Sequence, residues 1–194
     1  MSAGNSTERK AQLGKSERDQ LEGVVVDLRE TVEEEIEYEL EHHYGLTERE
    51  GSEDLSEEEQ DTRERLVDAI DHENPDDKSW DWCYQQYITG VGYTIVNRLA
   101  AFRCMEVRGF LDQPVTQIGD SGLPPAAEQL LGERFDLGRE EALVAAYHEE
   151  CEAMAEEIEI LFDPDSRYSV IDPDPDLFRN LVGELDEISD DVWR

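Results

Sequence analysis

Five polar residues with distinctive chemistry lie within an otherwise apolar helical pattern at residues 93–111. They are Asn97, Arg98, Arg103, Glu106 and Arg108. A guanidinium group beside leucine and phenylalanine is costly to bury unless it has a partner, and a carboxylate or a phosphate can serve as one. On a helix, Arg103 and Glu106 are three residues apart and can pair, while Arg98 shares a face with Glu106. Asn97 lies on another side of the helix and can bond across a helix interface.

Two interpretations of these arginines differ in where the side chains point. A buried polar network would fix how the helix packs, whereas exposed arginines would serve as phosphate contacts. Leu99, Phe102 and Met105 alternate with the polar residues, which indicates burial on both sides of the helix. The pattern therefore favours the buried network.

Metal-ligating residue types occur in the sequence, but their spacing predicts no metal site. Glu39 and His42 have the spacing of carboxylate-bridged sites in helical bundles. Glutamate is so frequent that chance produces this spacing, and no matching second helix is present. The same objection applies around His148. The cysteines are odd in number and lack the spacing of a zinc site or a disulfide framework; they are Cys83, Cys104 and Cys151.

Motifs for nucleotide binding and catalysis are also incomplete. Gly90-Val91-Gly92 lacks the preceding strand that a dinucleotide-binding loop needs, and a bend or a close helix contact explains these glycines better. Asn74-Pro75 begins like the Asn-Pro-Pro-Tyr signature of amino-methyltransferases, but the second proline and the aromatic residue are absent. No plausible nucleophile–base pair is present. The residues therefore predict no catalytic or cofactor-binding position, and whether the chain belongs to an enzyme stays open.

The charge of the chain is strongly negative. Among 194 residues, 51 are Asp or Glu and 17 are Lys or Arg, for a formal net charge of -34. Lysine occurs only at Lys10, Lys15 and Lys78. Molar salt would screen the self-repulsion of such a surface, so we interpret the composition as a haloarchaeal type of adaptation. The alternative is an acidic protein that binds a partner.

Several features predict a cytoplasmic chain without a membrane partner. No hydrophobic run approaches the roughly 20 residues that span a bilayer. The N-terminal residues 1–20 are polar and lack the apolar region of a secretory signal. Unpaired, widely spaced cysteines fit a reducing compartment.

The periodicity predicts an all-α fold, an irregular bundle of about five helices around a long central helix. Residues 1–15 read as a disordered polar tail and 16–194 as a helical lobe. Within the lobe, residues 16–75 form an acidic helix pair. The first helix is capped by Ser16 with Asp19 and ends at Gly45, and the second is capped by Ser56 with Glu59. Residues 78–194 hold the core helices. Their predicted segments are a central helix from Trp80 to Leu111, a loop at 112–125, a helix at 137–162 and a short helix at 176–188.

The last residues, 189–194, have the pattern of a helix that is beginning: a serine cap, two acidic first-turn residues, then Val192 and Trp193. A large aromatic residue at the opening of an element suggests that the chain is truncated at its C-terminus and is a fragment of a larger protein. Left exposed, Val192 and Trp193 would offer a docking surface.

Residues 93–111 also resemble a segment near the N-terminus of large adenine-specific DNA methyltransferases of phage-exclusion (BREX or Pgl) systems and of related type IIG restriction-modification enzymes. Residues 161–164 and 182–193 resemble the same family, so the similarity covers roughly the second half of the chain. Ile95 and Val96 replace a usual Trp-Phe, and Cys104 replaces an aromatic residue. The matching residues are Tyr93, Thr94, Asn97, Arg98, Leu99, Ala101, Arg103, Met105, Glu106, Val107, Arg108, Gly109 and Leu111.

The resemblance implies a function that this chain does not perform alone. In that family the methyl donor is S-adenosylmethionine, bound by a glycine-rich loop, and an Asn-Pro-Pro-Tyr motif holds the target adenine. Neither motif is present here. The resemblance thus implies a non-catalytic N-terminal helical part of such an enzyme in phage defence. Its partner would be the catalytic domain, in cis or in trans, and DNA would be reached only through the parent enzyme.

Two alternatives belong to other classes. One is a free-standing acidic helical interaction protein of a halophile, which binds a partner or mimics the charge of DNA. The other is a separate helical regulatory subunit of a methyltransferase. A DNA mimic requires carboxylates gathered on one face, so an even distribution of acidic residues would count against it.

Overall fold

The computed structural model describes residues 14–50, 55–74 and 77–194, and these fold into helices without strands. The all-α prediction is therefore confirmed. Only Gly14 and Lys15 of the predicted tail 1–15 are described, and Lys15 already belongs to the first helix. In chain order the elements are α1 (Lys15–His42), α2 (Glu57–Asp71), α3 (Trp80–Val107), α4 (Pro125–Glu133), α5 (Arg139–Ala155), α6 (Glu159–Phe162), the 3₁₀ helix η1 (Arg167–Ser169), α7 (Pro175–Asp186) and α8 (Asp190–Trp193).

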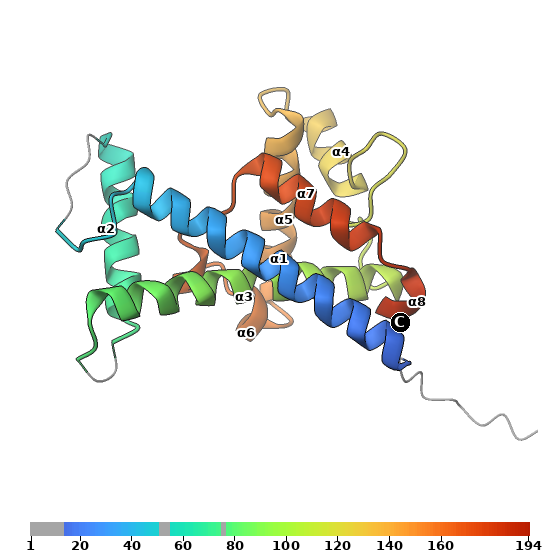
Figure 1. Cartoon of the computed structure of the whole chain (residues 1–194). Coiled ribbons are helices and arrows are strands. Elements are labelled where there is room, and N and C mark those ends of the chain that lie inside the picture. Colours follow the sequence, from blue (N-terminus) through green and yellow to red (C-terminus); the bar gives the residue numbers. More distant parts are fainter. Residues whose placement is uncertain (1–13, 51–54, 75–76) are drawn as a thin grey trace, which may run out of the picture.

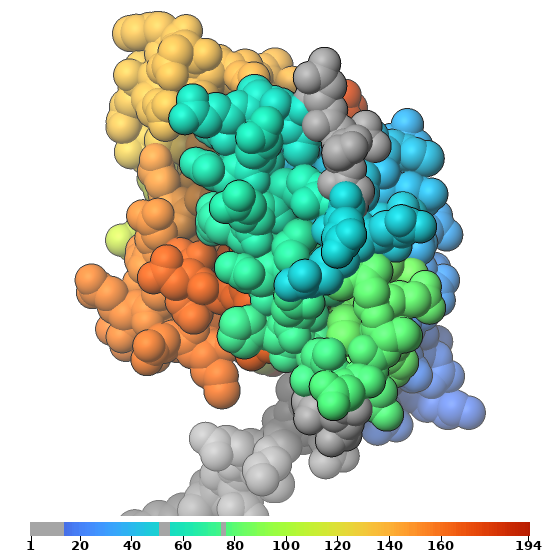
Figure 2. Space-filling view, turned by 90° about the vertical axis from the view of Figure 1, so that its left-hand side faces the viewer, coloured from blue at the N-terminus to red at the C-terminus, as the bar shows by residue number. Residues whose placement is uncertain are grey.

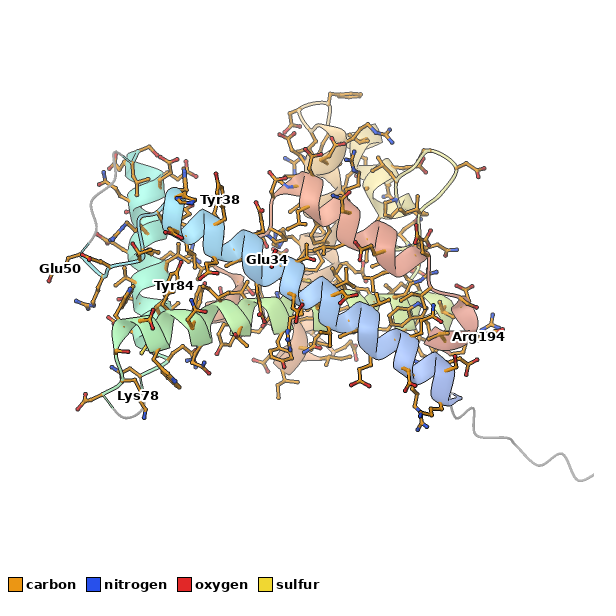
Figure 3. The ribbon with its side chains drawn as sticks, in the orientation of Figure 1. Glu34, Tyr38, Glu50, Lys78, Tyr84 and Arg194 are labelled. Atoms are coloured by element: carbon orange, nitrogen blue, oxygen red, sulfur yellow. The ribbon has the colours of Figure 1, made fainter. Side chains whose placement is uncertain are left out.

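Helix α3 is the centre of the fold. Helix α1 crosses it obliquely, α2 stands at one end and α8 lies near the other, while α6, η1 and α7 also contact it (Figure 1). The predicted acidic pair therefore packs chiefly on α3, with α1 and α2 making little contact with each other. Between the long helices, buried Tyr84 donates a hydrogen bond to the backbone oxygen of Glu37 at 3.3 Å, whereas Tyr38 projects away from the body (Figure 3).

The N-terminal helices begin and end largely where local signals place them. Ser56 caps α2 and forms a reciprocal capping box with Glu59, as predicted. Gly45 follows α1 with a φ of 60°, a conformation that suits glycine at the end of a helix. The predicted cap at Ser16 is wrong, because α1 begins two residues earlier: Gly14 is the cap residue and its N–H donates to the carboxylate of Glu17 at 2.6 Å.

The C-terminal half departs more from the predicted elements. Residues 125–133 form α4, a helix that was not predicted from the sequence because two prolines stand at its start. Proline nevertheless suits the first turn of a helix. The predicted helix 137–162 is divided into α5 and α6, because the backbone leaves the helical conformation at Ile158 (φ -136°, ψ 62°). Helix α7 ends at Asp186, close to the predicted end.

The C-terminal helix is packed into the core, and the expected exposed docking edge is wrong. Val192 and Trp193 are both buried, Trp193 to 3% exposure. Helix α8 rests on α1 and α3. Ser189 caps it as predicted, accepting from the N–H of Asp191 at 3.4 Å. The apolar pattern at the end of the chain thus serves internal packing.

Helix α2 and the segment around residues 160–170 lie side by side on one face of the molecule (Figure 2). Tyr168 donates a hydrogen bond to Glu73 at 2.7 Å, and Arg167 pairs with the same carboxylate at 3.4 Å. These contacts place the Tyr168 ring against Gly90 in the middle of α3. The close contact predicted for the glycine pair is therefore present, and α3 continues through it as one helix.

Replacing Gly90 by alanine is expected to destabilise the protein by about 1–3 kcal/mol, because a Cβ at this position overlaps the Tyr168 ring. This outcome opposes the roughly 1 kcal/mol that alanine contributes over glycine inside a helix. Gly23→Ala in α1 is the matched control, since nothing lies within 4 Å of its Cβ, and it should stabilise. Equilibrium unfolding in denaturant measures both; equal effects of the two variants would contradict the role of Gly90.

A histidine–aspartate pair connects α5 to the segment before α7. Nε2 of His148 lies 2.8 Å from Oδ2 of Asp172. This hydrogen bond raises the pKa of His148 above its ordinary value, although burial of the ring opposes it. Because the pKa is higher in the folded state, the pair stabilises the protein fully below the unfolded value of about 6.5, and this contribution is lost as the pH rises through the raised pKa.

Asp172→Asn is therefore expected to lower the melting temperature more at pH 6 than at pH 9. The side chains are 41% and 37% exposed, so we expect at most about 1 kcal/mol at pH 6. Thermal unfolding of both proteins across this pH range measures the difference. A destabilisation that grows with pH would contradict the assignment.

Among the described residues, no helix combines the length and the apolarity needed to cross a membrane.

Candidate functional site

Helix α3 carries the arginines that the sequence singled out, and it turns two of them inward. Arg98 is 4% exposed and Arg103 is 3% exposed, so both are buried in a chain that is rich in carboxylates. Leu99 and Phe102 lie between them and are buried as well. The interpretation as a buried polar network is therefore confirmed for these two residues.

Arg98 holds the segment that contains α6 and η1. Its Nε donates to the backbone oxygen of Leu161 at 2.8 Å, and Nη2 donates to that of Asp163 at 2.7 Å. Nη1 donates to Oγ of Ser169 at 2.9 Å. The last carbonyls of a helix have no partner within the helix, so Arg98 supplies donors that a four-residue helix such as α6 cannot provide.

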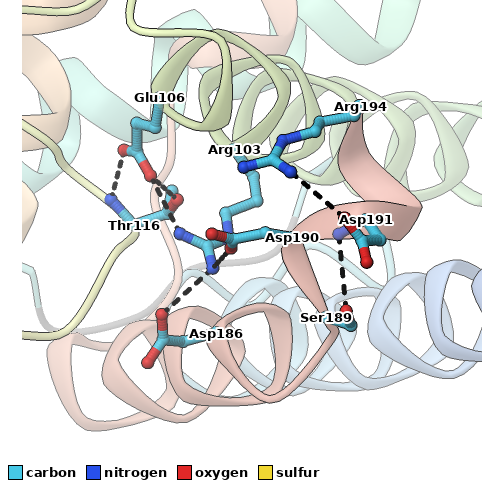
Figure 4. Close-up of polar contacts among 8 residues, drawn as sticks. All are labelled: Arg103, Glu106, Thr116, Asp186, Ser189, Asp190, Asp191 and Arg194. Atoms are coloured by element: carbon cyan, nitrogen blue, oxygen red, sulfur yellow. Dashed lines mark hydrogen bonds and ion pairs between the residues drawn. The ribbon is translucent and has the colours of Figure 1, made fainter.

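Arg103 lies at the centre of an ion cluster that joins α3 to the two C-terminal helices (Figure 4). Nη2 lies 3.0 Å from Oδ1 of Asp190 on α8 and 3.3 Å from Oδ1 of Asp186 on α7. Nη1 lies 3.6 Å from Oε2 of Glu106, so the predicted pair with Glu106 is confirmed. One guanidinium therefore faces carboxylates from three helices.

Glu106 extends the cluster to the segment that follows α3. Its Oε1 accepts the backbone N–H groups of Val115 and Thr116, both at 2.7 Å, and its Oε2 accepts the Thr116 hydroxyl. The Glu106 side chain is fully buried. Although Arg98 and Glu106 are two turns apart on one helix, they serve different segments. A buried carboxylate that is paired and bonded in this way fixes the geometry around it.

The other two predicted residues face outward. Asn97 is exposed, so the predicted bond across a helix interface is wrong for this residue. Arg108 is exposed too, and its Nη2 donates to the backbone oxygen of Arg194 at 2.8 Å. The cluster also contains residues that sequence reasoning did not assign: Thr116, Asp186 and Asp190. Their only signal was charge or polarity, which is common in this chain.

The chemistry of the cluster is structural. Its carboxylates bond to a guanidinium or to backbone N–H groups, so they are engaged as acceptors inside the fold.

The thiols of the three cysteines are not activated as nucleophiles. Burial raises the pKa of all three, that of Cys151 to about 12, which disfavours the thiolate at neutral pH. Cys83 and Cys151 are buried and Cys104 is half-buried.

Within the described ranges, no group of three or more His, Cys, Asp or Glu side chains is placed to hold a metal ion. His42, from the Glu39–His42 spacing, is an exposed residue at the end of α1. Comparison of the chain with protein-family models, with curated proteins and with solved structures gives no match.

Proposed function

We propose that this chain is a non-catalytic helical scaffold of an S-adenosylmethionine-dependent, adenine-specific DNA methyltransferase of the phage-exclusion or type IIG kind. The proposal rests on the resemblance of residues 93–111 to that family. A scaffold is supported by the contacts of the two buried arginines, because Arg98 and Arg103 bind protein oxygens in α6, α7 and α8. A segment engaged in this way holds a fold together and offers few donors to phosphate.

In this proposal the catalytic domain, in cis or in trans, binds S-adenosylmethionine and the target adenine. This chain contributes a rigid helical surface to it and reaches DNA only through the parent enzyme. The negative surface is unfavourable for direct contact with phosphates. Arg108, the exposed arginine of the motif, is engaged with the backbone at Arg194.

Two experiments test the proposal. The coding DNA that follows the Arg194 codon in the source genome should encode a glycine-rich donor-binding loop and an Asn-Pro-Pro-Tyr motif, or a neighbouring gene should. The purified chain should transfer no tritiated methyl group from S-adenosylmethionine to unmethylated DNA, while the chain together with that catalytic module should. Transfer by the chain alone, or a genome region without such a module, would contradict the proposal.

We also propose that the protein works in a cytoplasm with a high salt concentration. At molar salt the Debye length falls from about 10 Å to about 3 Å, which screens repulsion among carboxylates. We therefore expect the melting temperature to rise between 0.1 and 2 M KCl; a gain of about 2 kcal/mol corresponds to roughly 4–8 °C for a chain of this size. Circular dichroism during heating measures this shift. A melting temperature that stays constant or falls would contradict adaptation to salt.

The alternative, an acidic interaction protein that mimics DNA, requires carboxylates gathered on one face. Exposed carboxylates instead occur on α1, α2, α4, α5 and α7. This distribution does not favour a mimic. It agrees better with a general adaptation of the whole surface.

A further inference from the structure

A groove of about 560 Å³ lies beside the arginine-bearing helix. One wall is the outer face of α3, with Tyr93 and Asn97, and the other is α6, with Glu159 and Ile160. Asp163 lines it at the turn that follows α6, and Arg98 lies at its base. We call it the α3–α6 groove.

Both walls of the α3–α6 groove are held by polar contacts. On the α3 side, Nη1 of Arg29 donates to the Tyr93 hydroxyl at 2.8 Å, and the guanidinium carbon lies 4.9 Å from the centre of the ring. Arg29 is fixed in turn by Glu33, at 3.1 Å. On the other side, the bonds from Arg98 to the backbone hold α6 in place. A preformed groove loses little conformational entropy when it is filled.

Two apolar side chains that line the α3–α6 groove are exposed in the described fold. Ile160 is 98% exposed, and Tyr93 is 50% exposed. Ile158, which precedes α6 and does not line the groove, is exposed as well. An isoleucine and an aromatic ring that line the same concave surface offer apolar area to one aliphatic side chain of a partner.

The charge of the groove restricts what can fill it. Glu159 and Asp163 contribute carboxylates, and Arg98 is the one cation among the described residues that line it. Nε, Nη1 and Nη2 of Arg98 each already donate to an oxygen of the protein. An occupant with basic groups is therefore favoured over a neutral or acidic one.

We propose that the α3–α6 groove docks a short basic amphipathic segment of a partner protein. An aliphatic side chain of the segment enters between Tyr93 and Ile160, and a lysine or arginine one helical turn away faces Glu159 and Asp163. Asn97 offers an amide to the polar edge of the segment. The volume suits a few side chains, which is the size of a helix-in-groove anchor and smaller than the face of a domain. This inference does not depend on the proposed function.

The test uses the full chain and a displayed library of helical 14-residue peptides randomised on one face. Enriched peptides should pair an aliphatic residue with lysine or arginine one turn away. Fluorescence anisotropy with the most enriched peptide should show at least a tenfold loss of affinity for Ile160→Asp and for Glu159→Lys. Both residues are exposed, so the variants should fold as the parent does, which circular dichroism checks.

Two matched variants and one exchange of charge complete the test. Phe135→Asp and Glu128→Lys make the same changes at exposed positions in and after α4 and should leave the affinity unchanged. A peptide with glutamate in place of its basic residue should regain affinity for Glu159→Lys. Three results would each overturn the proposal: no enrichment above the unselected library, enrichment of acidic peptides, or equal binding by Ile160→Asp and Phe135→Asp.

Discussion

Arg103→Met is expected to lower the free energy of unfolding by about 3–5 kcal/mol, the usual cost of removing one partner from a buried ion pair. The substitution leaves Glu106 fully buried without its cation, and it leaves Asp186 and Asp190 facing each other. Methionine fills much of the volume of the arginine stem, so the loss reports the charge more than a cavity.

Equilibrium unfolding in guanidinium chloride, followed by circular dichroism, measures this loss. Arg194→Met removes an exposed pair with Asp191 and should cost less than about 1 kcal/mol. The double variant Arg103→Met/Glu106→Gln should recover part of the stability, because glutamine keeps an oxygen acceptor for Val115 and Thr116 without a buried charge. A loss below about 1 kcal/mol for Arg103→Met would show that the cluster does not hold the C-terminal helices.

Arg98→Met is expected to cost about 2–5 kcal/mol, because the backbone oxygens of Leu161 and Asp163 lose a charged donor. The effect should be concentrated in the segment from α6 to η1. Arg98→Lys should recover only part of the loss, because a single ammonium group cannot reproduce the planar fork that reaches Leu161, Asp163 and Ser169 together.

Native-state hydrogen exchange distinguishes this local role from a general one. Amides of residues 159–169 should exchange faster in Arg98→Met, while those of α1 change little. Arg179→Met is the control, since it removes the exposed contacts of Arg179 with Glu140 and Asp176. Full stability of Arg98→Lys, or faster exchange spread evenly over the chain, would contradict the assignment of Arg98 to α6.

The parts of the fold that follow from neighbours in the chain were predictable. Two of these parts join residues within one helical turn: the Ser56–Glu59 capping box and the Arg103–Glu106 pair. A third is the glycine after α1, whose conformation depends on the residue itself. Such contacts depend on local geometry that the residue types themselves specify. Helix α4 and the break at Ile158 were missed. A proline pair can end one element or begin the next, and Ile158 carries no local signal for a break.

The sequence by itself determined that the chain is helical, that a long central helix begins at Trp80 and that the arginines on it need partners; the predicted end at Leu111 was four residues too late, because α3 ends at Val107. Only the tertiary structure decided which partners these are: Leu161, Asp163 and Ser169 for Arg98, and Asp186 and Asp190 for Arg103. The reason is physical. Helical periodicity fixes which side chains share a face, but many carboxylates and carbonyls of this chain could satisfy a guanidinium. Packing of segments more than 60 residues apart selects among them.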